Sequence, residues 1–326
     1  MSTFELSGAK CLVTGGAGFL GSHIAKRLVE AGAEVRATYH VKPPAADARG
    51  AYIKTDLRTA EACAKAVDGM DYVFHAAANT QGAAVIRLQP LAHVTPNVPM
   101  NLFLLDQAHK AGVKRFLFIS SGAAYPDTGH RPAEEHEMFE GEPVDVYYAV
   151  AWMKRYAEIL CKTYATKIPK PMDCVVVRPS NVYGPGDKFD PATSHVTAAL
   201  IKRVAERQDP FEVWGTGEEV RDLIYIDDFM DGLFAAFHAP EPFLAVNICS
   251  GEGVTVKEVM NTAFEVGDFS NPHVSFNSTK PSTAPVRRLS AKLAKEKLGF
   301  EVKVNLPAGL KRAIDWYRAN PFKPAA

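Results

Sequence analysis

The sequence has little of several features that mark specialised protein classes. Its five cysteines in 326 residues are odd in number and widely spaced, which excludes a disulfide framework and a cysteine-based metal site from our expectations. Its apolar runs fall well short of the roughly 20 residues that a membrane span requires. Basic and acidic residues both number 37, so neither nucleic acid nor an anionic membrane is expected as a partner. We expect a cytoplasmic protein with buried, reduced thiols.

A glycine-rich stretch, Gly15–Gly21, is the most informative local pattern. It follows an apolar run, Cys11–Thr14, and opens an amphipathic segment, which is the order strand, tight turn and helix. Gly15 permits the turn, Gly18 lets the backbone approach a pyrophosphate, and Gly21 lets the helix pack closely on the strand. The helix N-terminus adds unpaired N–H groups and a positive dipole. The stretch therefore predicts a dinucleotide site.

Short apolar strands alternate with helical patterns from residue 10 to about residue 118. This alternation predicts an α/β fold with a doubly wound parallel sheet, the Rossmann type, in which crossovers are right-handed. A ligand of such a fold lies beyond the carboxyl ends of the strands. The predicted strands are Cys11–Thr14, Val35–Thr38, Tyr52–Lys54, Tyr72–His75, Phe116–Ser120 and, after a helix over about 148–167, Cys174–Arg178.

Beyond about residue 182 the alternation loosens and prolines become frequent. We expect residues 1–181 to form a dinucleotide-binding domain, to which 222–250 return. Residues 182–321 are expected to form mainly a smaller C-terminal substrate lobe that closes over the crevice. Residues 322–326 are expected to form a tail.

The end of the second strand bears on the choice of cofactor. Proteins that prefer NAD usually carry Asp or Glu there to hold the ribose hydroxyls, whereas this chain has Tyr39, His40 and Lys42. The two basic side chains could meet a 2′-phosphate, so NADP(H) is favoured and NAD(H) stays possible. Asp56 could accept a hydrogen bond from an adenine amino group or cap the next helix. The other predicted cofactor contacts are Gly15, Gly18, Phe19, Leu20, Gly21, Leu57, Ala76, Ala77 and Asn97.

Longer stretches resemble the extended short-chain dehydrogenase/reductases that act on nucleotide sugars, within the NAD-dependent epimerase/dehydratase family. The resemblance extends from the glycine loop to Trp316 and is greatest to the GDP-L-fucose synthases. It implies an NADP(H)-dependent reductase or epimerase/reductase of a GDP-4-keto-6-deoxyhexose, and a homodimer. The stretches that carry it are Ser120–Pro126, Asn181–Phe189, Ser194–Leu200, Val213–Gly217 and Val220–Asp228.

The same resemblance implies residues for ketone reduction. Ser121 would bind the carbonyl oxygen, a tyrosine would donate the proton, and Lys154 would assist that tyrosine and hold the nicotinamide ribose. The family places the lysine four residues after the tyrosine, whereas here Tyr148 is six residues before Lys154 and Tyr147 is seven before it. Six residues along a regular helix rotate by about 240°, so Tyr148 needs a later helix start or a bulge to reach Lys154. The donor is Tyr148, Tyr147 or neither.

Epimerisation needs two acid/base groups on opposite sides of the sugar ring. The resemblance supplies His195, but Ala123 stands where the family has a cysteine, and alanine cannot carry a proton. We therefore expect epimerisation at one carbon or none, or the use of another group such as His136 or Asp127. The substrate-binding residues that the resemblance implies are Asn181, Lys188, Trp214, Arg221 and Arg288.

Two other functions stay open at this point. One is a nucleotide-sugar epimerase or dehydratase that holds NAD tightly and regenerates it in each cycle. The other is a non-catalytic protein that binds NADP(H) or a nucleotide sugar, which would suit the disrupted tyrosine–lysine spacing and the missing cysteine.

Overall fold

A parallel sheet of seven strands forms the centre of the protein. The structure is a computed structural model of the chain, and it describes residues 4–80, 82–191, 193–280 and 283–322. Every neighbouring pair of strands in the central sheet is parallel, which confirms the predicted doubly wound α/β fold. In spatial order the strands are β11 (Phe243–Ile248), β6 (Asp173–Pro179), β5 (Arg115–Ile119), β4 (Tyr72–His75), β1 (Lys10–Thr14), β2 (Glu34–Tyr39) and β3 (Ala51–Lys54).

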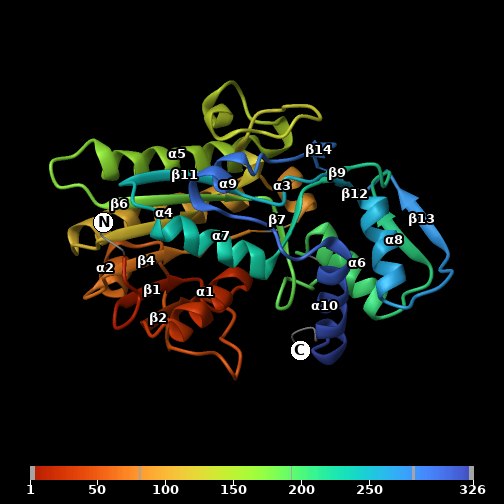
Figure 1. Cartoon of the computed structure of the whole chain (residues 1–326), viewed down its shortest axis with the longest axis horizontal. Coiled ribbons are helices and arrows are strands. Elements are labelled where there is room, and N and C mark those ends of the chain that lie inside the picture. The colour runs from red at the N-terminus through yellow and green to blue at the C-terminus, as the bar shows by residue number, and fades with distance from the viewer. Residues whose placement is uncertain (1–3, 81, 192, 281–282, 323–326) are drawn as a thin grey trace.

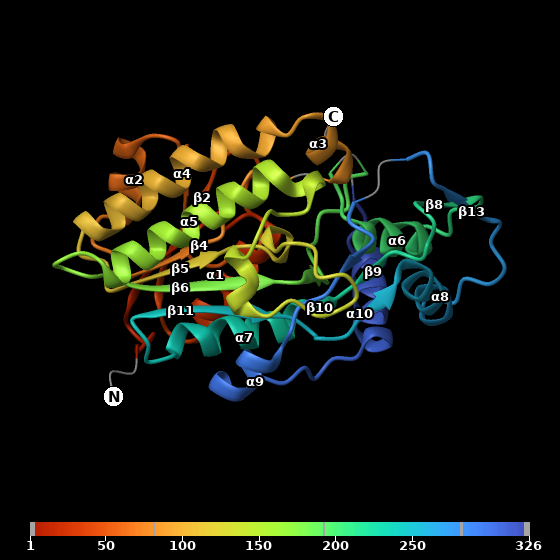
Figure 2. The ribbon, with the colours of Figure 1, turned by 90° about the horizontal axis from the view of Figure 1, so that it is seen from above.

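Helices cover both faces of this sheet, as the two views in Figures 1 and 2 show. One face carries α2 (Ala60–Val67), α4 (Leu91–Lys110) and α5 (Tyr148–Thr166), and the other carries α1 (Phe19–Glu30), α7 (Ile226–His238) and α9 (Lys292–Leu298). The six strands predicted from apolar runs are present with ends displaced by one residue at most. No helix within the described ranges is both long and apolar enough to cross a bilayer.

Smaller sheets and helices gather beyond the carboxyl ends of the central strands (Figure 2). Of the segment 222–250, α7 and β11 lie with the central sheet, whereas β10 pairs with β7. Residues 323–326 of the predicted tail lie outside the described residues. The elements of this end are β7 (Asn181–Tyr183), α6 (Val196–Ala205), β8 (Phe211–Trp214), β9 (Val220–Arg221), β10 (Leu223–Tyr225), β12 (Val254–Thr255), α8 (Val256–Val266), β13 (Val274–Asn277), β14 (Val286–Arg287) and α10 (Leu306–Ala319).

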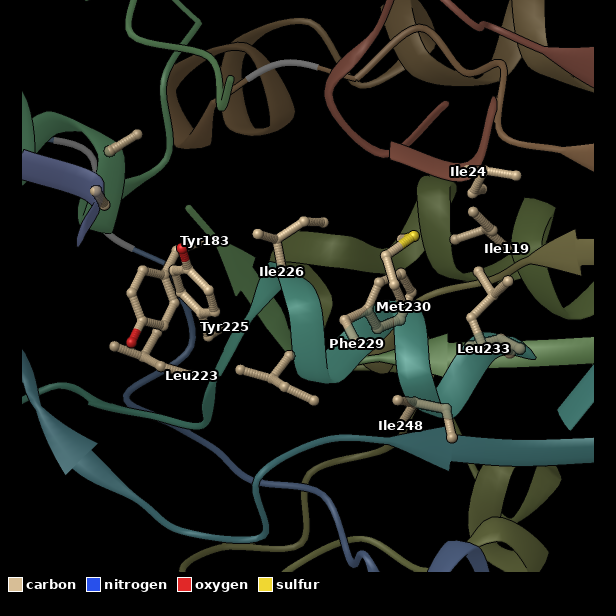
Figure 3. Packing of buried hydrophobic residues seen from close by; sticks show 14 of the residues in the cluster. Ile24, Ile119, Tyr183, Leu223, Tyr225, Ile226, Phe229, Met230, Leu233 and Ile248 are labelled. Atoms are coloured by element: carbon tan, nitrogen blue, oxygen red, sulfur yellow. The ribbon is translucent and has the colours of Figure 1, made fainter. Parts of the chain in front are cut away.

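One apolar core joins the two ends of the molecule. The buried side of α7, which includes Phe229 and Leu233, packs toward Ile119 of β5 (Figure 3). The same cluster continues to Tyr183 and Tyr225, whose ring centroids are 5.7 Å apart in an edge-to-face arrangement. Burial of each large apolar side chain contributes roughly 1.5–3 kcal/mol, so this core holds the smaller sheets and helices firmly on the central sheet.

Short helical segments complete the chain around the carboxyl edge of the sheet. They are α3 (Ala83–Leu88), η1 (Gly122–Ala124), η2 (Glu135–Phe139) and η3 (Asp145–Tyr147).

Candidate active site

The glycine loop between β1 and α1 is closed to larger side chains. Gly15 has a φ of +67°, and a Cβ added there would lie 2.8 Å from the Cα of Ala77. A Cβ added at Gly21 would lie 2.2 Å from the carbonyl oxygen of Gly15. The loop can therefore bring its backbone unusually close to a ligand or to a neighbouring strand.

The start of α1 offers the donors that a pyrophosphate requires. Gly18 caps the helix without a side-chain hydrogen bond, and the first turn contains no acidic residue. Among the described residues, the N–H groups of Phe19, Leu20 and Gly21 find no acceptor. Free N–H groups and the positive end of the helix dipole together form an anion site. The residues present therefore fit a dinucleotide cofactor.

Hydrogen bonds tie neighbouring strand ends to this loop. The N–H of Gly15 donates to Thr38 Oγ1 (3.2 Å) and that of Ala77 donates to Thr14 Oγ1 (3.1 Å). His75, which the sequence did not single out, lies 2.7 Å from Thr14 Oγ1 through Nδ1 and 2.9 Å from Asn101 Oδ1 through Nε2. Burial lowers the pKa of His75 to about 4, so the ring is neutral and positions the end of β1.

The end of the crevice at β2 and β3 is rich in charge. Asp56 accepts hydrogen bonds from Arg58 Nε at 2.9 and 3.0 Å, and Arg58 holds the pKa of Asp56 at about 2. His40 Nε2 lies 3.7 Å from Asp56 Oδ2. Arg58 was missed from the sequence, although it stands two residues after Asp56. It adds a cation next to the predicted His40 and Lys42, while the predicted contact Leu57 is buried.

Asn97 positions the loop that follows β4. Its Oδ1 accepts from the N–H of Asn79 (2.8 Å), and its Nδ2 donates to the carbonyl oxygens of Asn79 (3.0 Å) and His93 (2.6 Å). The amide is therefore engaged by backbone groups on both sides. The loop that it holds begins with Ala76 and Ala77, two of the predicted cofactor contacts.

Lys154 lies beneath the end of β5. Its Nζ donates to the carbonyl oxygen of Ile119 (2.8 Å) and lies 4.6 Å from the centroid of the Phe118 ring. Burial lowers the pKa of Lys154 to about 8.

Two residues beyond Ile119, Ser121 Oγ accepts from the N–H of Ala123 (3.1 Å). A hydroxyl that accepts one hydrogen bond keeps its own proton for donation to a ligand.

The structure separates Tyr148 from Lys154. Helix α5 begins at Tyr148, so the later start that pairing would need is absent. Tyr148 belongs to an exposed stripe about 80° wide, and Lys154 lies about 240° from it on the buried side. Its side chain is 53% exposed, and its ring meets Trp152 edge-to-face at 6.5 Å. The exposed large apolar residues of α5 are Tyr148, Trp152, Tyr156 and Ile159.

Tyr147 instead lines a pocket together with Ala123, Asp127 and Arg287. Its side chain is 3% exposed, and Arg287 Cζ lies 5.0 Å from the centroid of its ring. Of the two substitutes considered for the missing cysteine, Asp127 therefore lies at the pocket. The other, His136, is exposed and pairs with Glu134 at 3.7 Å.

Two arginines and an asparagine meet where β14 lies beside β9. Strand β14 pairs with β9 so that Arg287 is opposite Arg221, and Arg287 donates to Asn181 Oδ1 at 2.7 Å. Burial, and then the charge of Arg287, lowers the pKa of Arg221 to about 10. Arg288, which the sequence favoured, donates instead to the carbonyl oxygens of His130 (3.2 Å) and Gly251 (3.3 Å). The structure thus groups Arg287, rather than Arg288, with Asn181 and Arg221.

The remaining substrate candidates lie around this group. Lys188 Nζ donates to the carbonyl oxygen (2.9 Å) and the hydroxyl (2.6 Å) of Thr80, which joins the loop after β7 to the loop after β4. His195 caps α6 and is accessible. Partial desolvation of the ring by neighbouring protein atoms, and then the charges of Lys188 and Arg287, lower the pKa of His195. Trp214 is 40% exposed, and Lys280 Nζ lies 5.5 Å from the centroid of its ring.

Comparison with known proteins decides the family. Residues 11–249, from β1 through β11, match the NAD dependent epimerase/dehydratase family. The chain belongs to this family. Membership confirms the resemblance inferred from the sequence, and with it the prediction of an enzyme of the extended short-chain dehydrogenase type.

Relatives of this family member agree with that assignment. It is 33% identical to GDP-L-fucose synthase 1 of Arabidopsis thaliana over 257 residues, which cover 76% of this chain and 77% of the relative. It is 29% identical to GDP-mannose 3,5-epimerase of the same plant, over 97% of this chain and 84% of the relative. Its structure resembles UDP-glucose 4-epimerase of Thermotoga maritima with a TM-score of 0.84 and 27% identity, over 95% and 99% of the two chains.

This epimerase/dehydratase family member carries most of the groups that carbonyl chemistry needs. The Ser121 hydroxyl can donate to a developing alkoxide. A lowered pKa keeps His195 neutral near pH 7, so it can accept a proton from carbon. Ala123 offers no second acid/base group, and Lys154 has no tyrosine one helical turn before it.

Proposed function

We propose that this protein is an NADP(H)-dependent nucleotide-sugar reductase or epimerase/reductase that acts on a GDP-4-keto-6-deoxyhexose. The observation that carries the proposal is the grouping of Arg221, Arg287 and Asn181 on β9, β14 and β7, beyond the carboxyl ends of the central strands. Two guanidinium groups in one place match the charge and geometry of a diphosphate. The names of the two plant relatives, a GDP-L-fucose synthase and a GDP-mannose 3,5-epimerase, support GDP as the nucleotide.

The roles of the residues follow from their places. When bound, the dinucleotide cofactor supplies the hydride for the sugar ketone. The N–H groups at the start of α1 would hold its pyrophosphate, and Lys154 would hold the nicotinamide ribose. Ser121 Oγ would donate to the ketone oxygen. His195 would move a proton at a ring carbon, and with Ala123 in the second position the expected outcome is epimerisation at one carbon or none.

The direct test is consumption of NADPH, followed at 340 nm, with GDP-4-keto-6-deoxymannose generated in place by a separate dehydratase. We expect steady turnover that needs both the keto-sugar and NADPH. A protein that copurifies with oxidised NAD and never consumes added NADPH would be an internal-redox epimerase or dehydratase instead. Tight binding of the nucleotide sugar without turnover would indicate a binding protein.

The residue at the end of β2 should set the cofactor preference. We expect Tyr39→Asp to lower the ratio of kcat/KM for NADPH to that for NADH by about tenfold or more, because a carboxylate repels a 2′-phosphate and accepts from the ribose hydroxyl. Tyr39→Phe, which adds no charge, is the matched control. Equal changes in both variants, or a wild-type preference for NADH, would contradict this cofactor proposal.

We propose a homodimer that forms through the exposed apolar stripe of α5. Replacement of Trp152 and Tyr156 by glutamate should convert the dimer to monomer, because a charged pair cannot be buried there without partners. Light scattering coupled to size-exclusion chromatography measures the mass, and Val302→Glu, at an exposed position away from α5, serves as the control. A wild-type monomer would refute the proposal.

All five cysteines are free and buried, which supports a reducing, cytoplasmic environment.

A further inference from the structure

The helical position next to Lys154 holds no proton donor. Val150 lies four residues before Lys154, one turn away on the same side of α5. Its side chain packs against a buried cluster that includes Ala124, Tyr125 and Met138. Because valine can neither give nor take a proton, and because Tyr148 lies on the exposed stripe, the donor for a bound ketone has to come from another element.

Two tyrosines line the pocket, but the hydroxyl of Tyr125 donates to Asn247 Oδ1 (2.7 Å) and accepts from Arg178 (2.8 Å). The other tyrosine is Tyr147. It is the last residue of η3, and its N–H donates to the carbonyl oxygen of Val144 (2.8 Å), which fixes the backbone before α5 begins. Its ring is buried, yet its hydroxyl has no hydrogen-bond partner among the described residues. A buried tyrosine usually pairs its hydroxyl. The unpaired hydroxyl in a wall of the pocket is therefore available to a ligand.

Arg287 supplies the cation that faces this ring. Its Cζ lies 5.0 Å from the centroid of Tyr147, within the range in which a guanidinium is attracted to an aromatic face. The hydrogen bond to Asn181 Oδ1 (2.7 Å) holds the guanidinium in place. Lys154, by contrast, donates to Ile119 beneath β5 and is not among the residues that line the pocket.

We propose that Tyr147 is the proton donor of this enzyme and that Arg287, in place of Lys154, stabilises the tyrosinate that remains. This inference rests on the proposed reduction of a sugar ketone. As the ketone carbon accepts the hydride, the π electrons of the C=O bond move to oxygen, and that oxygen takes the proton from Tyr147 Oη. The products are the alcohol and a tyrosinate, which regains its proton from water.

The test compares Tyr147→Phe with the matched variant Tyr148→Phe. We expect Tyr147→Phe to lower kcat by about 10²–10³-fold, in the range that a positioned acid contributes, and Tyr148→Phe to change it by less than about threefold. Calorimetric Kd values for GDP and NADP⁺ should stay within about twofold of wild type in both variants, which separates a lost proton donor from a disturbed fold. Retention of most of the activity by Tyr147→Phe, or a loss confined to Tyr148→Phe, would overturn the assignment.

A double-substitution cycle tests the role of Arg287. Arg287→Lys keeps the charge but not the planar group, and we expect it to lower kcat by about tenfold in the wild-type background and to add no further loss to Tyr147→Phe. Equal losses in both backgrounds would show that Arg287 acts on another group.

The proposed function can fail separately from this assignment. If wild-type protein consumes no NADPH but shows a transient 340 nm absorbance of bound reduced cofactor when a GDP-sugar is added, the reductase proposal fails. The same two tyrosine variants then test the proton transfer, and loss of the transient only in Tyr147→Phe supports Tyr147. A wild-type protein that shows neither signal overturns both proposals.

Discussion

Gly15→Ala should weaken binding of the dinucleotide by about two orders of magnitude. The added Cβ would lie 2.8 Å from the Cα and 2.9 Å from the N of Ala77. These atoms belong to the backbone and cannot rotate away as the tip of a side chain can. Either the glycine loop or the loop after β4 must therefore shift, and a shift of the glycine loop moves the N–H groups that face the pyrophosphate. The Kd for NADP⁺, measured by calorimetry, gives the effect.

A matched control separates the collision from the strain of the backbone. Gly69 has a φ of +72° and no atom within 4 Å of an added Cβ. It precedes the amino end of β4, at the edge of the sheet away from the crevice. Gly69→Ala should cost only about 1 kcal/mol of stability and leave the Kd unchanged. A Gly15→Ala variant whose Kd stays within threefold of wild type would show that the loop does not bind the cofactor.

Arg178→Met should lower the free energy of unfolding by about 3–5 kcal/mol, the cost of leaving one partner of a buried ion pair alone. Arg178 Nη2 lies 2.6 Å from Glu158 Oε2, and the two side chains are 3% and 2% exposed. Arg178 also donates to Tyr125 Oη at 2.8 Å, and Glu158 accepts a hydrogen bond from Ser120 Oγ. The substitution leaves the buried Glu158 carboxylate without its cation, next to Ser120 and so one residue before Ser121. The midpoint of urea denaturation, with its slope, measures the loss.

Two further variants test whether the loss of stability in Arg178→Met comes from the buried ion pair. Lys311→Met removes an exposed partner of Asp315, at 3.0 Å one helical turn away, and should cost no more than about 0.5 kcal/mol. Adding Glu158→Leu to Arg178→Met should recover part of the stability, because the uncompensated charge is then gone. Equal losses for Arg178→Met and Lys311→Met would contradict a buried pair that matters to the fold.

The sequence predicted the sheet and the strand–turn–helix form of the glycine loop well because both depend on local order. Apolar runs of three to five residues, glycines at a strand end and the alternation of strand with helix leave few topologies. The positions of Tyr147 and Tyr148 relative to Lys154 could not be predicted from local order. Whether Tyr148 reaches Lys154 depends on the residue at which α5 begins. The chain before that residue is held in η3 by the hydrogen bond from the N–H of Tyr147 to the carbonyl oxygen of Val144, which the sequence pattern does not show.

The grouping of Arg287 with Arg221 could not be predicted from the sequence for a related reason. Adjacent residues of a strand point to opposite faces, so the register of β14 against β9 decides which guanidinium joins Arg221. A sequence without known pairings does not contain that register. His75 was overlooked because a single histidine within an apolar strand is usually a core residue, and only the fold places it between Thr14 and Asn101.

The continuous core from α7 to Tyr183 and Tyr225 makes the two ends of the protein one cooperative unit. Rotation of one end away from the other would expose that core to water, so a ligand has to enter through movement of loops and not through hinged opening. The same coupling spreads the stabilisation that a ligand gives. A ligand bound at the proposed site of Arg221 and Arg287 would raise the free energy of every opening that breaks the shared core, including openings of the glycine loop that it does not touch. Binding of a ligand at one end of the protein would therefore make local opening at the other end less frequent.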